Sequence, residues 1–567
     1  MRVRWLAVAA VLGVAFVLLV STGPDDPYIS FWPAHTLVER GELLNYDGER
    51  VEQSSSLLWV LVLALAHAGT RASLSTTAWA LGWISCGAAL FRATVLTREL
   101  GGRARTGLIL VAGTSPSLAY WSFSGMETML VAWLVVELAI AAARGMTRPD
   151  RWSRLHAALA TAALLAARPE AQFVLVATWI ACAALARGPE RREALVWLAV
   201  TCAGALALAG FRWTYFGAPL PLPVYAKYGA APLERIAAGI EYAALQLRRP
   251  FTVTLLPILV ASPWLLWTTR RRPDAAGLRF ALLLLGAGSG FILTAGGDWM
   301  PAGRFFAHLG PLAFAVAAVW LGRDSVPRSW RRGLSAAVVA AHAVGLAVLM
   351  VTSSGLPLWE ALERDDAVRC HLGGDAHGFV ERANRSRVAN LIFLGAIEPW
   401  IETWTRESHG RRLSILSGQA GLVAFYLTER FGDRIEFVDR YGLSTTHAHR
   451  SRREKPLGSS RTGMRQPLRE ALSRGDERAL RSPDVIFDIH DDADTLAAFD
   501  YQVVLREVGS FGGVSLGVGP YRIHDDDPIH QYLAVRRKAW GLTVPDEMRT
   551  RVWSSGDFSA RSACRSR

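Results

Sequence analysis

Cysteine is scarce in this chain, with only five among 567 residues. Cys86, Cys182 and Cys202 fall inside apolar runs, where a thiol packs as a small hydrophobic side chain. Cys370 and Cys564 lie in the polar C-terminal part and could form a disulfide there if that part is extracytoplasmic. None of the five stands at a Cys/His spacing typical of zinc, so the sequence contains no recognisable zinc module.

Nucleotide-binding loops are missing as well. There is no GxxxxGK[ST] loop and no GxGxxG turn after a predicted strand, so ATP- or nucleotide-sugar-driven chemistry in the cytoplasm is unsupported. Histidine- or aspartate-rich stretches at 447–449, 490–494 and 524–527 look like metal-ligand clusters. Asp-rich turns between strands explain them without a metal, so we predict no metal site there.

Hydrophobic residues, by contrast, are abundant. They make up 51% of the chain, which has 21 Trp and a mean hydropathy of +0.21, and this composition predicts a polytopic membrane protein. The net charge of +13 comes from Arg in short loops between apolar runs, so no nucleic-acid partner is expected. The basic start and apolar run of residues 1–20 are interpreted as a first span and signal anchor rather than a cleaved signal peptide.

The apolar runs give the topology. The run at 55–69 is short for a span, which needs roughly 20 apolar residues, and is predicted to lie in or along the interface. With that helix left out, every basic loop falls on one side, and the positive-inside rule predicts about eleven spans. The N-terminus is then cytoplasmic and the tail outside. The other runs are 4–20, 75–95, 107–123, 127–143, 155–167, 171–187, 194–212, 250–268, 279–295, 303–321 and 333–353.

The composition changes near residue 354, where charged residues become frequent and spans stop. The stretch 411–443 predicts a strand, a Gly turn, an amphipathic helix and a second strand, and further strands are predicted at 483–492, 501–509 and 513–527. The predicted fold is therefore a polytopic α-helical membrane domain followed by a soluble α/β domain. Their ranges are 1–353, with a first extracytoplasmic loop at 21–74, and 354–567, which is also extracytoplasmic.

Nearly every irregular, Gly/Pro-rich and polar loop of the membrane region falls on the predicted outer side, which suggests a site at that surface. The first of them contains Asp25 and Asp26. Because Asp26 precedes Pro27, an extended backbone is expected, in which the two side chains point to opposite faces. The pair could supply a general base for an acceptor hydroxyl, or it could form a helix cap or turn; the two residues alone leave both open. The other outer loops are 122–128, 167–172, 216–229 and 296–305.

The sequence of these loops resembles a known family. The stretch "DDPYISFWPAHTLVERGELLNYDGERVEQSSSLLW" resembles the first extracytoplasmic loop of GT-C-type glycosyltransferases, in the branch of the mycobacterial terminal arabinofuranosyltransferase. The chain departs from that loop at Trp32–Pro33 and at Gln53–Ser55. The resemblance covers most of the chain through further matches at "WSFSGMET", "ARPEA", "YFGAPLPLPVYAK", "GGDWMP", "SGQAGLVAFY" and "FVDRYGLS".

The resemblance implies a transferase in a bacterial inner membrane that moves a sugar from a polyprenyl-phosphate donor to an extracytoplasmic glycan or lipid acceptor, with inversion. Asp25 or Asp26 would be the base, and Tyr28 follows them in the same motif. Enzymes of this type differ in metal dependence, so Mg²⁺ or Mn²⁺ at the two aspartates stays open, and no other cofactor is expected. The donor phosphate needs cations at the membrane boundary, for which the outer loops offer Arg168, Lys227 and Arg304, although each could equally anchor a helix at the interface.

Carboxylates near span ends are further candidates. Glu127 could orient the acceptor or cap the next helix, and Asp298 could pair with Arg304 across a turn. For Glu170, pairing with Arg168 is the expected role. Glu49 and Glu52 are expected in a solvated loop.

Two alternatives remain at this point. One is a transporter or flippase of lipid-linked sugars, for which Glu137 is the main candidate intramembrane carboxylate. The other keeps the fold and changes the sugar, for example to mannose or aminoarabinose. The absence of a repeat and the location of the polar motifs at one face favour surface catalysis over transport.

Overall fold

The computed structural model describes most of the helical region and part of the C-terminal region. The described residues are 25–97, 111–147, 150–227, 232–247, 252–269, 275–298, 300, 303–321, 328–353, 394, 401–402, 404, 412–417, 420–439, 444, 484–489, 501–509, 529–536 and 552–554. The first apolar run, at 4–20, and the segments 447–467 and 513–527 lie outside them.

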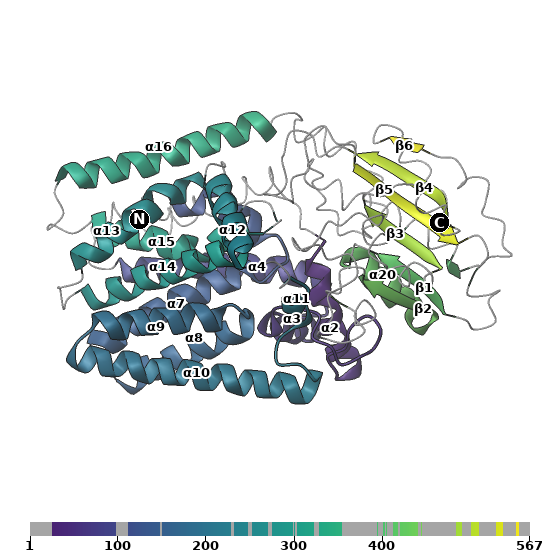
Figure 1. The fold of residues 1–567 in the computed structure, drawn as a ribbon, viewed down its shortest axis with the longest axis horizontal. Helices are drawn as coiled ribbons and strands as arrows, with labels where there is room; N and C mark the ends of the chain where they lie inside the picture. Colours follow the sequence, from purple (N-terminus) through teal and green to yellow (C-terminus); the bar gives the residue numbers. More distant parts are fainter. Residues whose placement is uncertain are drawn as a thin grey trace.

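A bundle of helices forms the larger body of the molecule (Figure 1). Most of the predicted apolar runs are helices of this bundle. The helices are α2 (Pro27–Arg40), α3 (Leu57–Thr70), α4 (Leu74–Leu96), α6 (Pro116–Ser122), α7 (Thr128–Thr147), α8 (Arg151–Ala167), α9 (Ala171–Leu185), α10 (Gly188–Phe216), α11 (Leu222–Lys227), α12 (Pro232–Gln246), α13 (Leu256–Thr269), α14 (Ala276–Ala295), α15 (Arg304–Leu321) and α16 (Arg328–Ser353).

Helix α7 is the centre of the bundle and packs against α4, α8, α14 and α15. Its residues Met129, Ala132, Val136 and Ala139 are fully buried and recur at helical spacing, so small and flexible side chains let the neighbouring helices approach closely. Helix α10 lies at the edge of the bundle, and its Leu206 is 73% exposed. Such an exposed leucine fits a helix that faces lipid.

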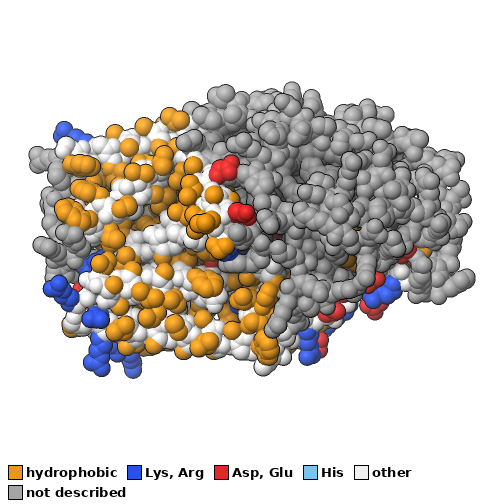
Figure 2. Space-filling view, in the orientation of Figure 1, with side chains coloured by type: hydrophobic (Ala, Val, Ile, Leu, Met, Phe, Trp, Pro, Cys, Tyr) orange, Lys and Arg blue, Asp and Glu red, His pale blue; other side chains and the backbone are white. Residues whose placement is uncertain are grey.

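The lengths of the helices agree with a membrane protein. Among the described residues, α4, α7, α10 and α14 are long and apolar enough to cross a bilayer, while α3, α9, α13 and α15 are shorter apolar helices. Helix α3, the run predicted to lie at the interface, has 14 residues, about 21 Å at 1.5 Å per residue, against a hydrocarbon core of about 30 Å. Figure 2 shows hydrophobic side chains spread over the bundle, with Lys and Arg mostly at the end away from the sheet. The total of eleven spans stays a prediction.

Two of the predicted local conformations are wrong. The run 107–123 is not one continuous helix, because the chain turns at Thr114 and Ser115 before α6 begins at Pro116, which cannot donate a helical hydrogen bond. Asp26 is not extended; its φ of −56° and ψ of −28° are helical. Pro27 is the first residue of α2, a position that suits proline, and the turn forms through hydrogen bonds to the carbonyls of Asp25 and Asp26.

The contacts of the bundle separate its two ends. Predicted inner loops contact one another: Arg154 pairs with Glu193 at 3.2 Å, and Arg279 with Glu190 at 2.6 Å. Predicted outer loops also meet: Trp59 Nε1 donates to the Gly125 carbonyl at 3.0 Å. Loops predicted on the same side of the membrane are thus in contact with one another, as expected if successive spans cross the membrane in alternating directions.

The C-terminal region contains a six-stranded mixed sheet in the order β2-β1-β3-β5-β4-β6. Strand β1 lies between β2 and β3 and is parallel to both, whereas β5 is antiparallel to β3 and β4. The strands are β1 (Leu413–Ser417), β2 (Ile435–Asp439), β3 (Val485–Ile489), β4 (Tyr501–Gly509), β5 (Ile529–Arg536) and β6 (Val552–Ser554). Helix α20 (Leu422–Phe431) connects β1 to β2, which confirms the strand–turn–helix–strand pattern expected over 411–443.

Helix α20 attaches this sheet to the helical body. It contacts α2, and the two share an aromatic cluster in which Phe425 packs against Tyr28, Phe31 and Trp32, with ring centroids 5.6, 6.5 and 6.0 Å apart. These rings are nearly fully buried, so the contact excludes water. The predicted first outer loop, which contains α2, is therefore enclosed between the bundle and the sheet.

Candidate active site

The aspartate pair lies where α2 begins, against the sheet domain. The carboxylate of Asp25 accepts hydrogen bonds from the backbone amides of Gly421 at 3.0 Å and Leu422 at 2.6 Å. Each carboxylate oxygen takes one amide. Asp26 follows as the residue that precedes the first turn of α2, and its carbonyl accepts from the amide of Ile29 at 3.0 Å. The structure thus brings the two predicted residues together but gives them different surroundings.

Tyr28, predicted to bind substrate, is 5% exposed. Its ring makes edge contacts with Phe31 at 5.0 Å and Phe425 at 5.6 Å, and its hydroxyl accepts from Ser75 Oγ at 3.5 Å. The ring therefore belongs to the aromatic cluster between α2 and α20. A direct contact with substrate at Tyr28 stays a prediction.

The rest of the first outer loop is fixed by buried polar contacts. Trp32 Nε1 donates to the Asn45 carbonyl at 2.7 Å, and Gln53 Nε2 donates to the Ile29 carbonyl at 2.7 Å. Glu52 forms a two-pronged ion pair with Arg212 of α10, at 2.7 and 3.0 Å. The expectation that Glu52 lies in a solvated loop is wrong, because its side chain is 5% exposed.

A second cluster of charged residues lies where α7 and α15 begin and α8 ends. Arg168, at the end of α8, pairs with Glu127 and, through Nε, with Glu170 at 2.6 Å. Arg304, the first residue of α15, has its Nε 2.7 Å from Asp298 Oδ2. The two pairs predicted from short spacing, Arg168 with Glu170 and Asp298 with Arg304, are confirmed. All five side chains are buried or nearly so.

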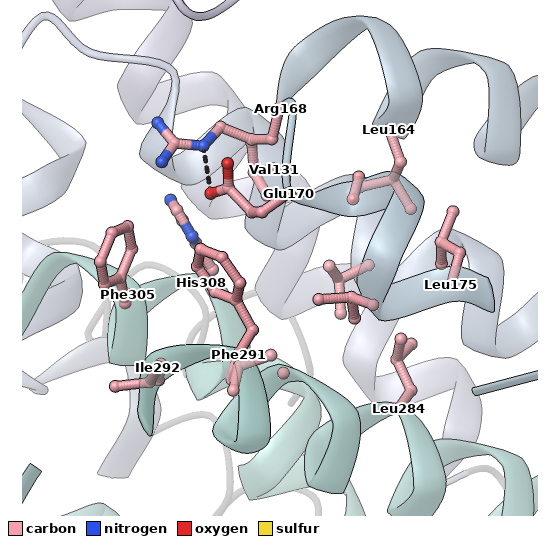
Figure 3. A pocket seen from close by; sticks show the side chains of 15 residues that line it. Val131, Leu164, Arg168, Glu170, Leu175, Leu284, Phe291, Ile292, Phe305 and His308 are labelled. Carbon is pink, nitrogen blue, oxygen red and sulfur yellow. Dashed lines mark hydrogen bonds and ion pairs between the residues drawn. The ribbon is translucent and has the colours of Figure 1, made fainter. Parts of the chain in front are cut away.

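An apolar pocket opens beside this cluster (Figure 3). The cavity itself has a volume of about 60 Å³, and its walls come from α7, α8, α9, α14 and α15. Figure 3 shows Arg168 paired with Glu170 at one end of the pocket and His308 near them, whereas the remaining walls are aliphatic and aromatic. The pocket is therefore amphipathic, with one polar end.

His308 is the residue that the sequence analysis missed. It stands four residues after Arg304, on the same face of α15, and is 7% exposed. Its Nε2 has no hydrogen-bond partner among the described residues, and the same holds for Arg304 Nε, whose approach to Asp298 is poorly aligned for a hydrogen bond. An unsatisfied buried polar group costs about 1–3 kcal/mol, so His308 Nε2 would gain from a hydrogen-bonding ligand, whereas Arg304 Nε already faces Asp298 at 2.7 Å.

The aspartate pair and the charged cluster lie on the same side of the bundle. Gly125 has a φ of +76°, which glycine adopts without strain, and a Cβ at this position would lie 3.1 Å from the Pro27 side chain. Two residues further on, Glu127 pairs with Arg168. The loop 122–128 therefore joins the start of α2 to the charged cluster.

Two further residues stand apart from this assembly. Lys227 is the last residue of α11, and its side chain lies outside what the structure describes. Glu137, in the middle of α7, accepts hydrogen bonds from Arg92, Trp133 and His156, and the Arg92 guanidinium binds both of its oxygens. Its charge is therefore compensated inside the bundle.

The fold identifies a class of protein. No protein-family model and no curated protein matches the chain. Among solved structures, ArnT from Cupriavidus metallidurans in the apo state matches with a TM-score of 0.52 at 15% identity, over 95% of this chain and 98% of that one. ArnT bound to undecaprenyl phosphate matches with a TM-score of 0.49 at 14% identity, over 94% and 97% of the two chains.

The chain therefore has the GT-C-type fold of ArnT over nearly its whole length. This confirms the expectation of a GT-C-like fold. The arabinofuranosyltransferase branch stays a prediction.

Proposed function

We propose that this protein is a membrane glycosyltransferase that takes a sugar from a polyprenyl-phosphate carrier and transfers it to an extracytoplasmic glycan or lipid. The observation that carries the proposal is the amphipathic pocket, whose polar end is formed by Arg168, Glu170 and His308. A lipid phosphate matches this arrangement, because its chain needs an apolar groove and its anionic head needs hydrogen-bond donors. The ArnT-like fold supports the same class of reaction.

The donors at the polar end would bind the phosphate that leaves in the reaction. His308 Nε2 is buried at this end and has no hydrogen-bond partner among the described atoms, and Arg168 lines the same end. Negative charge grows on the phosphate oxygens as the sugar–phosphate bond breaks, and buried donors stabilise that charge more than water does. Carboxylates at Glu127, Glu170 and Asp298 hold the guanidinium groups in place.

The acceptor requires a base on the opposite side of the sugar. We assign this role to Asp26, because the amides of Gly421 and Leu422 hold the Asp25 carboxylate against the start of α20, away from an acceptor hydroxyl. Asp26 would remove the hydroxyl proton as the acceptor oxygen bonds to the anomeric carbon, while the polyprenyl phosphate departs from the other face with the bonding electrons. The configuration is then inverted.

A divalent cation does not fit Asp25 well. Mg²⁺ and Mn²⁺ bind carboxylate oxygens, but here a cation would have to displace the amides of Gly421 and Leu422. Among the described residues, no group of three or more His, Cys, Asp or Glu is arranged to hold a metal.

The transport alternative depends on Glu137. A proton-coupled transporter needs an intramembrane carboxylate that changes its partners during the cycle. Glu137 is held by Arg92, Trp133 and His156 from three helices, a set that suits a structural tie between α4, α7 and α8. The geometry thus favours catalysis.

The test is transfer of radiolabelled sugar from a panel of polyprenyl-phosphate sugars in vesicles. Replacing His308 with Leu, which has no hydrogen-bonding group, should lower transfer about 10- to 100-fold, because a hydrogen bond to a charged group contributes about 1.5–3 kcal/mol. Asp26→Asn should abolish transfer. The control is Arg154→Gln, which changes an exposed arginine at the other end of the bundle and should leave transfer unchanged.

Two results would count against the proposal. Full transfer by His308→Leu would show that the pocket does not bind the donor phosphate through His308. Absence of transfer from every donor, with lipid-linked sugar still crossing the bilayer, would favour the flippase. The donor that is consumed in the panel identifies the sugar, which could be arabinofuranose, mannose or aminoarabinose.

A further inference from the structure

The turn between β1 and α20 holds a side chain from the opposite part of the sequence. β1 ends at Ser417 and α20 begins at Leu422, and the amides of Gly421 and Leu422 point at the two oxygens of Asp25. Amides in the first turn of a helix have no partner within the helix, and the helix dipole adds a positive field there. A carboxylate at this position is therefore strongly favoured.

The turn after β1 lies at a position in the sheet where many α/β proteins bind a ligand. Strand β1 has parallel neighbours on both sides, β2 reached through α20 and β3 reached later in the chain. In open α/β sheets, ligands bind outside the carboxyl end of a strand whose next two strands in the chain lie on opposite sides of it. Here that position is occupied by Asp25 of the same chain.

Other contacts close the position around Asp25. The Tyr46 hydroxyl donates to the carbonyls of Tyr28 at 3.1 Å and Gly421 at 3.4 Å, and the Tyr46 ring packs on Phe437 of β2 with centroids 5.7 Å apart. Burial and the nearby charge of Asp25 raise the pKa of Tyr46, so the hydroxyl keeps its proton and remains a donor. Both backbone groups of Gly421 are thus bound by the first outer loop.

Gly421 has no room for a side chain. A Cβ at this position would collide with the backbone oxygen and the carboxylate of Asp25. Any larger residue would therefore push the start of α2 away from α20. The close approach requires glycine.

We propose that Asp25 is a positioning residue, through which the α/β domain fixes the location of Asp26 from the N-terminus of α20. The catalytic effect through Asp26 rests on the proposed function. The contact between Asp25 and the amides of Gly421 and Leu422 does not depend on it. The domain then takes part in catalysis without touching the sugar. Its ligand-binding edge serves the neighbouring membrane domain and not a free nucleotide or other anion.

The experiment uses the full-length chain in detergent or vesicles and three variants. Asp25→Asn keeps the size of the side chain and removes its charge, and Gly421→Ala disturbs the same contact from the α/β domain without touching a carboxylate. Gly69→Ala is the matched control, since Gly69 lies in α3 with open space around its Cβ position. Melting temperatures establish that the variants are folded.

Two readouts separate the contact from its catalytic effect. Hydrogen exchange of the peptide containing residues 421 and 422 should be slow in wild type and Gly69→Ala and at least tenfold faster in Asp25→Asn and Gly421→Ala. In the transfer assay, kcat should fall about 10- to 100-fold in both of the latter variants, with the KM for the lipid donor unchanged. The acid limb of the pH–rate profile, which belongs to Asp26, should remain in Asp25→Asn.

Three outcomes would overturn the proposal. Unchanged exchange in Asp25→Asn would mean that the contact is not made. Loss of the acid limb in Asp25→Asn would make Asp25 itself the base. Faster hydrogen exchange at residues 421 and 422 with an unchanged kcat in Asp25→Asn and Gly421→Ala would show that the contact does not position Asp26. If wild type transferred no sugar at all, the proposed function would fail, and exchange would still decide whether the domain binds Asp25.

Discussion

At the scale of single residues, burial separates ion pairs of the first outer loop that look equivalent in the sequence. Glu52 and Arg212 are 5% and 4% exposed and bind through two hydrogen bonds. Glu52→Gln leaves the Arg212 charge buried without its partner, so we expect a loss of about 3–5 kcal/mol in the free energy of unfolding. Thermal unfolding in detergent would show this as a clear drop in melting temperature.

The control is the pair Glu42–Arg50, which is close in sequence but exposed, with side chains 42% and 55% accessible. Solvent screens such a pair, so Glu42→Gln should not change the melting temperature measurably. Equal melting temperatures for Glu52→Gln and wild type would contradict the buried character of the Glu52 contact.

The residue scale also shows what spacing can predict. The pairs Arg168–Glu170 and Asp298–Arg304 are two and six residues apart, and short-range spacing predicted both. Glu127 reaches Arg168 across 41 residues, and Glu52 reaches Arg212 across 160, so only the packing of helices brings them together. The amide contacts of Asp25 span nearly 400 residues. His308 could have been found, because it follows Arg304 by one helical turn.

At the scale of elements, glycine permits a close helix contact. Gly82 of α4 lies directly against the last residue of α6, and a Cβ there would collide with the Ser122 carbonyl. Small residues let helices approach in this way. Gly82→Ala should therefore force the helices apart and cost about 1–3 kcal/mol of stability, seen as a lower melting temperature.

Gly87, on the same helix, provides the comparison. Nothing lies within 4 Å of its Cβ position, so Gly87→Ala should leave the melting temperature unchanged or raise it slightly, as alanine favours helix over glycine. A larger loss for Gly87→Ala than for Gly82→Ala would refute the close packing of α4 on α6.

Elements with a strong hydrophobic period were predictable, and interrupted ones were not. Strand β1, helix α20 and strand β2 follow directly from apolar patterning around a glycine turn. Strand β5 was missed, because its sequence "IHQYLAVR" mixes polar and apolar residues and takes its place only by pairing with β3 and β4. A residue before proline is usually extended, and this rule gave the wrong conformation for Asp26. Asp26 is helical because Pro27 is the first residue of α2.

At the scale of the whole molecule, charge and architecture agree. The sheet lies at one end of the bundle in Figure 1, and Lys and Arg side chains lie mostly at the opposite end in Figure 2. Arg191 and Arg192, at the start of α10, are exposed residues of a predicted inner loop. Since basic loops stay in the cytoplasm, the sheet domain and the candidate site are predicted to face the outside.

Labelling of single cysteines tests this orientation. In a chain whose five native cysteines are replaced, cysteine is introduced at three exposed positions: Glu39 of α2, Arg434 after α20, and Arg192. A membrane-impermeant maleimide added to intact cells should label the first two, and Arg192→Cys only after the membrane is opened. Labelling of Arg192→Cys alone in intact cells would reverse the predicted orientation. It would place the aspartate pair in the cytoplasm, where an acceptor outside the membrane could not reach Asp26.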